Sequence, residues 1–198
     1  KFLARGDQPT ADGNLARIAE LVDRMGRLTG QLKSFARKSS GRPQAVPLRR
    51  AIDNALFLLE QRCQRAGVRV NIELAPPELL AWCDANRLEQ VLVNLVSNAL
   101  DAMADQPAPR LDISARRQGE RIELQVRDRG PGLAEEARSH LFEPFFTTKD
   151  AGSGLGLGLA ISAGIVADFG GSLTGDNHAQ GGAVFTLDLP IAPEPGHE

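Results

Sequence analysis

Four glycines at every second position between residues 152 and 158 constrain this chain more than any other feature. An apolar segment, residues 160–169, follows them directly. Each glycine in ordered structure costs about 0.5–1 kcal/mol relative to alanine, so four of them need a compensating role. Backbone N–H groups at the start of a helix, where a phosphate can bind, would supply that role. A flexible hinge or a tight turn is the alternative reading of the glycines alone.

Composition indicates one ordinary globular domain with an appendage. The chain has 198 residues, of which 42% are hydrophobic and 24% charged, so a packed core can form. A net charge of −2 argues against a nucleic-acid partner. Cys63 and Cys83 lack metal-ligand spacing and are expected to be buried thiols. No apolar run reaches the length of about 20 residues that a membrane span needs. Because the chain begins with Lys1 rather than Met, we expect a fragment of a longer protein.

The first 38 residues differ in pattern from the rest of the chain. Apolar side chains in residues 14–38 follow uninterrupted 3–4 spacing, which predicts a long helix with a coiled-coil stripe. One helix cannot bury this stripe alone, so a hairpin dimerised into a four-helix bundle is expected, the alternative being a helix packed on its own domain. Residues 39–46 read as a linker, residues 47–192 as the main domain and residues 193–198 as a disordered tail.

Alternating helical and strand patterns fill the main domain. Helical spacing covers residues 47–66, 85–104, 135–141 and 155–169. Strand patterns cover residues 68–74, 111–117, 122–126, 172–174 and 183–189, with a short apolar run at 79–83. Asp84 precedes the second helix as a candidate N-cap. This mixture predicts an α/β domain.

The helix over residues 85–104 carries amides where a solvated face would favour Lys and Glu. Asn94 and Asn98 lie one turn apart, and Asp101 follows on the same predicted face. Asparagine is a poor helix former, which favours a ligand-facing surface over a merely solvated one. Amide oxygens also suit Mg²⁺, which keeps several waters and takes few protein ligands.

Two loops add candidate binding groups. Asp128 ends a predicted strand and precedes Gly130 and Gly132, so a flat ligand could approach the backbone while the carboxylate accepts a hydrogen bond; ordinary turn chemistry is the alternative. Residues 142–149 are rich in phenylalanine and too broken for a strand, as in a lid anchored by aromatic side chains. Lys149, beside the glycines, could reach a phosphate or could be solvated.

In this order the motifs resemble those of the ATP-binding domain of two-component sensor histidine kinases, within the superfamily shared with gyrase, Hsp90 and MutL. The matching segments are residues 94–99 (the asparagine box), 128–132 (the first glycine box), 142–149 (the phenylalanine box) and 154–159 (the second glycine box). Residues 14–38 look like the second helix of the dimerisation and phosphoacceptor hairpin. The subgroup most similar is the sensors for C4-dicarboxylate or acidic amino-acid uptake.

The resemblance implies a two-layer α/β sandwich, with a mixed sheet on one side, helices on the other, and ATP between the helices and the lid. Asp128 would bind the adenine amino group, Asn98 would hold Mg²⁺ with Asn94 near the metal, and the glycines would wrap the triphosphate. Ala183 departs from the small hydroxyl residue of many relatives, which puts one secondary contact in doubt. The cofactor-binding residues carried over are Asn94, Asn98, Asp101, Ala102, Asp128, Gly130, Gly132, Leu133, Phe146, Thr148, Lys149, Gly154, Leu155, Gly156, Leu157 and Gly158.

The implied reaction is phosphoryl transfer rather than hydrolysis. In the related ATP hydrolases a glutamate that activates water precedes the metal asparagine by one turn, and here that position is Asn94. An amide cannot act as a general base, so ATP would be kept for another acceptor. An ATP-driven conformational machine of the gyrase, MutL or Hsp90 kind is the alternative. A dinucleotide fingerprint is excluded, because Leu157 and Leu159 stand where its third glycine would be needed.

No histidine in the chain suits the phosphoacceptor. His140, His178 and His197 lie within or after the ATP domain, so the acceptor is expected outside this chain, which would bind Mg-ATP without autophosphorylating alone. The resemblance further implies a homodimeric parent protein in the bacterial inner membrane, with this domain in the cytoplasm and a response regulator receiver domain as partner.

Overall fold

The computed structural model describes residues 13–15, 18, 42–148 and 155–193. The chain divides into two compact units, Lys1–Ser39 and Ser40–Glu198, which are considered separately. In the first unit, residues 13–15 and 18 are helical, as expected at the start of the predicted long helix. The rest of that helix, and nearly all of the predicted tail, lie outside the described residues.

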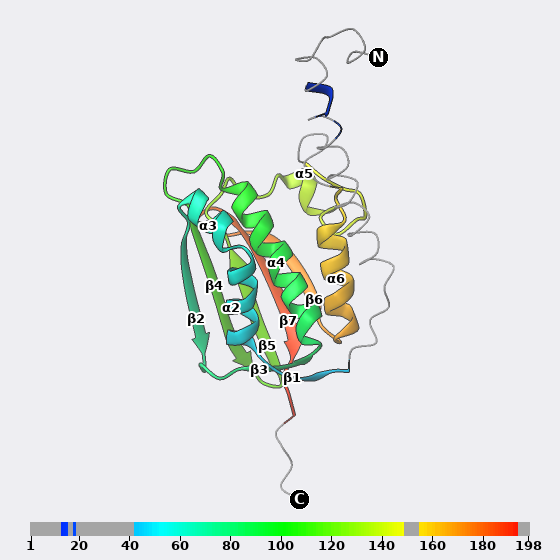
Figure 1. Cartoon of the computed structure of the whole chain (residues 1–198). Coiled ribbons are helices and arrows are strands. Elements are labelled where there is room, and N and C mark those ends of the chain that lie inside the picture. Colours follow the sequence, from blue (N-terminus) through cyan, green and yellow to red (C-terminus); the bar gives the residue numbers. More distant parts are fainter. Residues whose placement is uncertain (1–12, 16–17, 19–41, 149–154, 194–198) are drawn as a thin grey trace, which may run out of the picture. The chain divides into compact units, whose positions relative to one another are not determined.

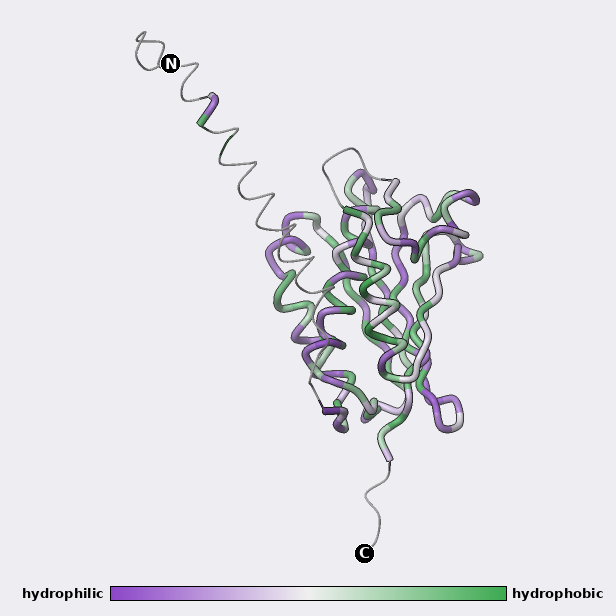
Figure 2. The backbone as a smooth tube through the Cα atoms, turned by 90° about the vertical axis from the view of Figure 1, so that its right-hand side faces the viewer, coloured by the Kyte–Doolittle hydropathy of each residue, from purple (hydrophilic) through white to green (hydrophobic). Residues whose placement is uncertain are grey.

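A five-stranded sheet forms one layer of the second unit (Figure 1). Its order is β2-β4-β5-β7-β6, and the sheet is mixed because β2 and β4 pair in parallel while the other neighbours pair antiparallel. Hydrophobic and hydrophilic residues alternate along the strands, which is visible in Figure 2. The strands are β2 (Arg69–Ala75), β4 (Arg110–Gln118), β5 (Arg121–Arg127), β6 (Ser172–Asn177) and β7 (Ala183–Pro190).

Helices form the second layer and cover one face of the sheet (Figure 1). α4 packs between α2 and α6 and contributes fully buried leucines, among them Leu88, Leu92 and Leu95, to the core between the layers. Asp84 caps α4 as predicted, because its Oδ1 accepts a hydrogen bond from the Arg87 N–H at 3.1 Å. The helices are α2 (Leu48–Leu58), α3 (Glu60–Ala66), α4 (Ala85–Ala102), α5 (Glu135–Arg138) and α6 (Gly158–Asp168). The predicted two-layer α/β sandwich is confirmed.

Three boundaries differ from the sequence prediction. The end of the expected linker is a strand: β1 (Gln44–Pro47) pairs antiparallel with β3 (Leu80–Cys83) as a separate two-stranded sheet. The predicted helix over residues 47–66 is broken at Leu59, whose backbone leaves helical geometry. α6 begins at Gly158, three residues later than predicted, because Gly156 adopts a positive φ of 66° that a helix does not allow.

The face of the sheet away from the helices is polar, since every second residue of β4 and β5 points there while the others are buried in the core. Among the described residues, the structure contains no helix with the length and apolar character to cross a bilayer.

Candidate functional site

Asp128 is buried at the point where β5 leaves the sheet, with only 3% of its surface exposed. Its Oδ1 accepts hydrogen bonds from the Gly130 N–H at 2.8 Å and from the Ala183 N–H at 3.1 Å. None of the described residues donates a hydrogen bond to the second oxygen, Oδ2. The two backbone donors therefore orient the carboxylate and leave one oxygen for an exocyclic amine. The hydroxyl that Ala183 lacks is not needed for this, because its backbone holds Asp128.

The carboxylate of Asp128 is kept in place against an electrostatic cost. Burial raises its pKa, and the hydrogen bonds from Gly130 and Ala183 and the charge of Arg127 oppose that rise. A raised pKa means that part of the folding free energy is used to hold a charge in a poorly solvated place. Carboxylates with a perturbed pKa are common at functional sites, which favours a role for Asp128 in binding.

Glycines let the backbone close around Asp128. A Cβ on Gly130 would lie 2.8 Å from the carbonyl oxygen of Ala102, at the end of α4. Gly182 has a φ of 82°, and a Cβ there would lie 2.0 Å from the carbonyl oxygen of Asp128. Ala102, Asp128 and Gly130, all predicted site residues, are thus brought together, and the turn after β6 closes the group.

Asn177, at the end of β6, clamps the loop that follows Asp128. Its Oδ1 accepts from the Leu133 N–H at 2.6 Å, and its Nδ2 donates to the Leu133 carbonyl at 2.8 Å. Gly132 has a φ of 84°, and a Cβ there would meet Asn177 Oδ1 at 2.6 Å. The predicted residues Gly132 and Leu133 therefore take their positions from Asn177.

Asn94 links α4 to the start of α6. Its Nδ2 donates to Ser162 Oγ at 2.9 Å, and Ser162 is buried with 2% exposure. A Cβ on Gly158 would lie 2.3 Å from Asn94 Oδ1, so the last glycine of the repeat is needed for this close approach. The asparagine box and the second glycine box therefore meet at this point.

The N-terminus of α6 suits an anion. Its N-cap residue, Leu157, provides no side-chain cap, so the first N–H groups of the helix have no side-chain acceptor there. Leu157 itself is 2% exposed and anchors the turn in the core, which leaves only its backbone for a ligand. Leu155 is half-buried just before it.

The phenylalanine-rich segment is tied to the glycine loop through backbone contacts. The Phe145 N–H donates to the Gly156 carbonyl at 3.0 Å, and a Cβ on Gly156 would lie 2.3 Å from the Phe146 carbonyl oxygen. Phe146 is half-buried against the ring of His140, with 5.6 Å between ring centroids. Phe145, in contrast, is 66% exposed and has a φ of 70°, so it does not anchor the segment. Thr148 is exposed, and Lys149 and Gly154 lie outside the described residues.

The side chains of the predicted polar face of α4 contact two different helices, α6 and α3. Asn94 turns toward α6, whereas Asp101 accepts from Arg62 of α3 at 2.5 Å, and the same arginine donates to Ser97 at 2.6 Å. This pair places the carboxylate of Asp101 on the α3 side of the helix. Asn98 lies between Asn94 and Asp101 along α4, is half-buried, and makes a polar interaction of its own.

The donors on α4 fit a magnesium ion that is held mainly through phosphates and water. Among the described residues, no group of three or more His, Cys, Asp or Glu side chains is arranged as a metal cage. Single amide oxygens from Asn98 and Asn94 match the small number of protein ligands that Mg²⁺ usually takes beside a nucleotide.

Three residues with structural roles at the site escaped the sequence prediction. Ser162 interrupts an apolar helix four residues after Gly158, and that interruption could have marked it in the sequence. Gly182 stands between two predicted strands, where a turn is the ordinary role of a glycine, and nothing in the sequence marks Asn177. Two of the histidines are described: His140 Nδ1 lies 2.9 Å from Glu143 Oε1, and His178 belongs to the turn after β6.

Comparison with known proteins assigns this geometry to a family. Residues 83–193 match the family described as histidine kinase-, DNA gyrase B-, and HSP90-like ATPases. The C4-dicarboxylate transport sensor protein DctB of Pseudomonas aeruginosa is 42% identical over 182 residues, which cover 90% of this chain and 29% of that protein. DctB of Rhizobium meliloti is 39% identical over 191 residues, with 96% and 30% covered. The chain thus spans less than a third of the length of these relatives.

Solved structures agree with the sequence relatives. The nucleotide-free catalytic domain of histidine kinase ThkA superposes with a TM-score of 0.68 at 30% identity, covering 75% of this chain and 95% of that domain. ThkA in complex with the response regulator protein TrrA gives a TM-score of 0.73 at 27% identity, covering 91% and 52%. The chain therefore belongs to the family of histidine kinase-, DNA gyrase B- and HSP90-like ATPases and carries a histidine kinase catalytic domain.

Proposed function

We propose that this chain binds Mg-ATP and donates its γ-phosphoryl group to a histidine of a kinase dimerisation domain, for relay to an aspartate of a response regulator. Asp128 binds the adenine amino group through Oδ2. Asn98 would hold Mg²⁺ with Asn94 near the metal, and the start of α6 would hold the phosphates. Bound Mg²⁺ neutralises charge on the phosphate oxygens.

The observation that carries this proposal is the position of the two clusters along α4. Ala102, which contacts the Asp128 cluster, and Asn94, which contacts the start of α6, are eight residues apart. Eight residues of helix correspond to about 12 Å. A buried carboxylate at one end and uncapped N–H groups at the other suit a ligand with a base and a phosphate chain.

Asn94 favours transfer over hydrolysis. Its amide has no proton-accepting capacity comparable to a carboxylate, and its Nδ2 is already bound to Ser162. The main alternative, an ATP-driven conformational machine, needs a group that activates water, and Asn94 occupies the place expected for it.

The proposal extends to the parent protein. The relatives are sensor proteins, and the ThkA structure contains a response regulator, so we propose a homodimeric sensor kinase of the bacterial inner membrane, with this domain in the cytoplasm. Two of the relatives are named for C4-dicarboxylate transport, which favours that sensor subgroup.

Titration of Mg-ATP and Mg-GTP by calorimetry tests the binding site. Asn98→Ala should remove the Mg²⁺-dependent part of the nucleotide affinity while the protein stays folded. Gln64→Ala, on the exposed surface of α3, is the matched control and should bind as the wild type does. Unchanged ATP titration in Asn98→Ala would contradict the assigned role.

Labelled γ-phosphate tests the reaction. The chain alone should incorporate none, and addition of a dimerisation hairpin that carries the acceptor histidine should give acid-labile phosphate on that hairpin. Acid-labile label on the isolated chain would refute an external acceptor. Steady release of phosphate without any hairpin would instead support the ATP-driven machine.

A further inference from the structure

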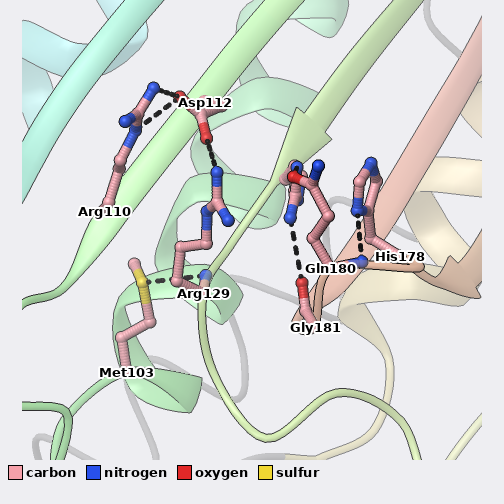
Figure 3. Close-up of polar contacts among 8 residues, drawn as sticks. Met103, Arg110, Asp112, Arg129, His178, Gln180 and Gly181 are labelled. Atoms are coloured by element: carbon pink, nitrogen blue, oxygen red, sulfur yellow. Dashed lines mark hydrogen bonds and ion pairs between the residues drawn. The ribbon is translucent and has the colours of Figure 1, made fainter.

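A shallow hollow of about 300 Å³ lies on the outer face of the sheet, away from the helices. It is lined mainly by polar residues of β2, β4 and β5, together with Arg129 just after β5 and His178 of the turn after β6. Nothing in the nucleotide site described above uses this face. Figure 3 shows part of it, with Arg110 and Arg129 on either side of Asp112.

Positive charge outweighs negative charge in the lining. Three guanidinium groups, those of Arg110, Arg127 and Arg129, accompany two carboxylates, those of Glu73 and Asp112. Asp112 is shared: Arg110 Nε lies 2.8 Å from its Oδ1, and Arg129 lies 3.4 Å from its Oδ2. The guanidinium groups hold the pKa of Asp112 below its usual range even though burial acts in the opposite direction. This one carboxylate is thus already engaged by two arginines.

Arg127 has no carboxylate partner among the described residues. Its contacts are with neutral acceptors, Gln180 Oε1 at 3.5 Å and the Gly181 carbonyl at 3.2 Å. Burial, then the neighbouring charges of Arg129 and Arg110, lower the pKa of Arg127, while the charges of Asp112 and Asp128 oppose that change. Burial, then the charges of Arg127 and Arg129, also lower the pKa of His178. Cationic side chains therefore outnumber carboxylates in the lining of the hollow.

Two hydrogen-bond donors here are unused. The Nε atoms of Arg127 and Arg129 are buried and have no acceptor in the part of the chain that the structure describes. Buried donors without a partner are rare, because each one costs about 1–3 kcal/mol. A ligand with closely spaced anionic oxygens would balance the excess positive charge of the hollow, since guanidinium groups match carboxylate and phosphate geometry.

We propose that the hollow bounded by Arg110, Arg127 and Arg129 binds a small oxyanion, a phosphate or a carboxylate. Its volume suits a small ligand, because small-molecule sites begin at about 300 Å³, whereas a stable protein partner would bury about 800 Å² of this face. Charge complementarity selects the oxyanion over neutral ligands of that size.

The proposed oxyanion site and the proposed nucleotide site share the end of β5, where Asp128 and its two neighbours lie. Asp128, between Arg127 and Arg129 in the chain, is buried, while its two neighbours line the hollow on the outer face. Arg127 also holds the Gly181 carbonyl, in the turn whose next residue, Gly182, packs against Asp128. An anion bound outside would thus restrain the same strand end that positions Asp128.

NMR titration of the ¹⁵N-labelled chain tests the proposal, with sodium phosphate and sodium malonate as probes and sodium chloride at equal ionic strength as reference. One or both oxyanions should give saturable shifts of the amides of Arg127, Arg129 and residues 178–181. Tighter binding of phosphate would assign a phosphate-bearing ligand, and tighter binding of malonate a carboxylate.

Arg127→Gln and Arg129→Gln should each weaken this binding about tenfold or more, as expected for loss of a charged hydrogen bond. Arg116→Gln is the matched control, because Arg116 lies on the same face but pairs with Glu123 at 2.8 Å, and it should leave the affinity unchanged. Shifts that never saturate, that follow ionic strength alone, or that persist in both arginine variants would overturn the proposal.

A repeat with saturating Mg-ADP separates the two sites. Phosphate bound at the start of α6 would be displaced by the nucleotide, whereas the outer-face shifts should persist. If the chain bound no nucleotide, the outer-face result would still stand, because its amides are observed directly.

Discussion

Gly182 provides the sharpest test of how the tertiary structure positions Asp128. Gly181 and Gly182 are adjacent and have nearly equal backbone angles, with φ values of 86° and 82°. A Cβ on Gly181 would meet nothing within 4 Å, whereas one on Gly182 would lie 2.0 Å from the Asp128 carbonyl oxygen. Replacing each glycine by alanine therefore separates the cost of the backbone angle from the cost of the contact.

The expected magnitudes follow from these two terms. An L-residue in the left-handed region costs about 1–2 kcal/mol, which is the whole expected loss for Gly181→Ala. Gly182→Ala adds an overpacked contact against backbone, worth about a further 1–3 kcal/mol. The total of about 2–5 kcal/mol is a large part of a typical domain stability of about 5–15 kcal/mol. The displacement also moves Asp128, so ATP affinity should fall about tenfold or more.

Urea denaturation of both variants measures the first effect, and calorimetric titration with Mg-ATP below the unfolding transition measures the second. Gly181→Ala should bind ATP as the wild type does. Equal stability and equal ATP affinity in the two variants would refute the claim that the close approach of Gly182 positions Asp128.

Three further substitutions test the site. Burial raises the pKa of Asp128 above its ordinary value of 3.8, so the folded state holds this proton more tightly than the unfolded chain and loses stability as the pH rises from 3.8 through the raised pKa. Asp128→Asn should remove this loss in urea midpoints measured as the pH is raised from 3.8, and it should weaken selectivity for ATP over GTP. An unchanged pH profile with unchanged selectivity would contradict both roles. Ser162→Ala should cost about 1 kcal/mol in urea denaturation by leaving Asn94 Nδ2 unpaired, whereas a cost of zero would show that the bond does not matter. Asn177→Ala should speed hydrogen exchange of the Leu133 amide, which loses its 2.6 Å acceptor, while Asn177→Asp, which keeps that acceptor, should change it less.

The elements of the fold were predictable because their signals are local. Period-2 alternation marked β4 and β5, and period-3.6 spacing with the Asp84 cap marked α4, since each pattern depends on which side of one element is buried. β1 was missed because four residues carry too little periodicity, and its strand character comes from pairing with β3. The break at Leu59 was likewise invisible in a continuous apolar spacing.

The candidate binding residues could also be recognised in the sequence, but the contacts between them could not. Residue types alone marked Asp128, Asn94, Asn98 and the glycines, because a strand-end carboxylate, helical amides and alternating glycines are costly unless they bind something. Only the tertiary structure decided that Asn94 faces Ser162 while Asp101 faces Arg62, because the rotation of α4 depends on packing against both neighbours.

The largest difference lies in contacts between distant segments. The roles of Asn177 and Gly182 depend on β7 pairing with β5 and on β6 pairing with β7, about 50 residues along the chain from Asp128, and no local pattern encodes such an approach. The same holds for the outer-face hollow, since strand pairing places Arg110 beside Arg127 and Arg129. Local sequence thus determined which groups are present, and the packing of the sheet decided which of them meet.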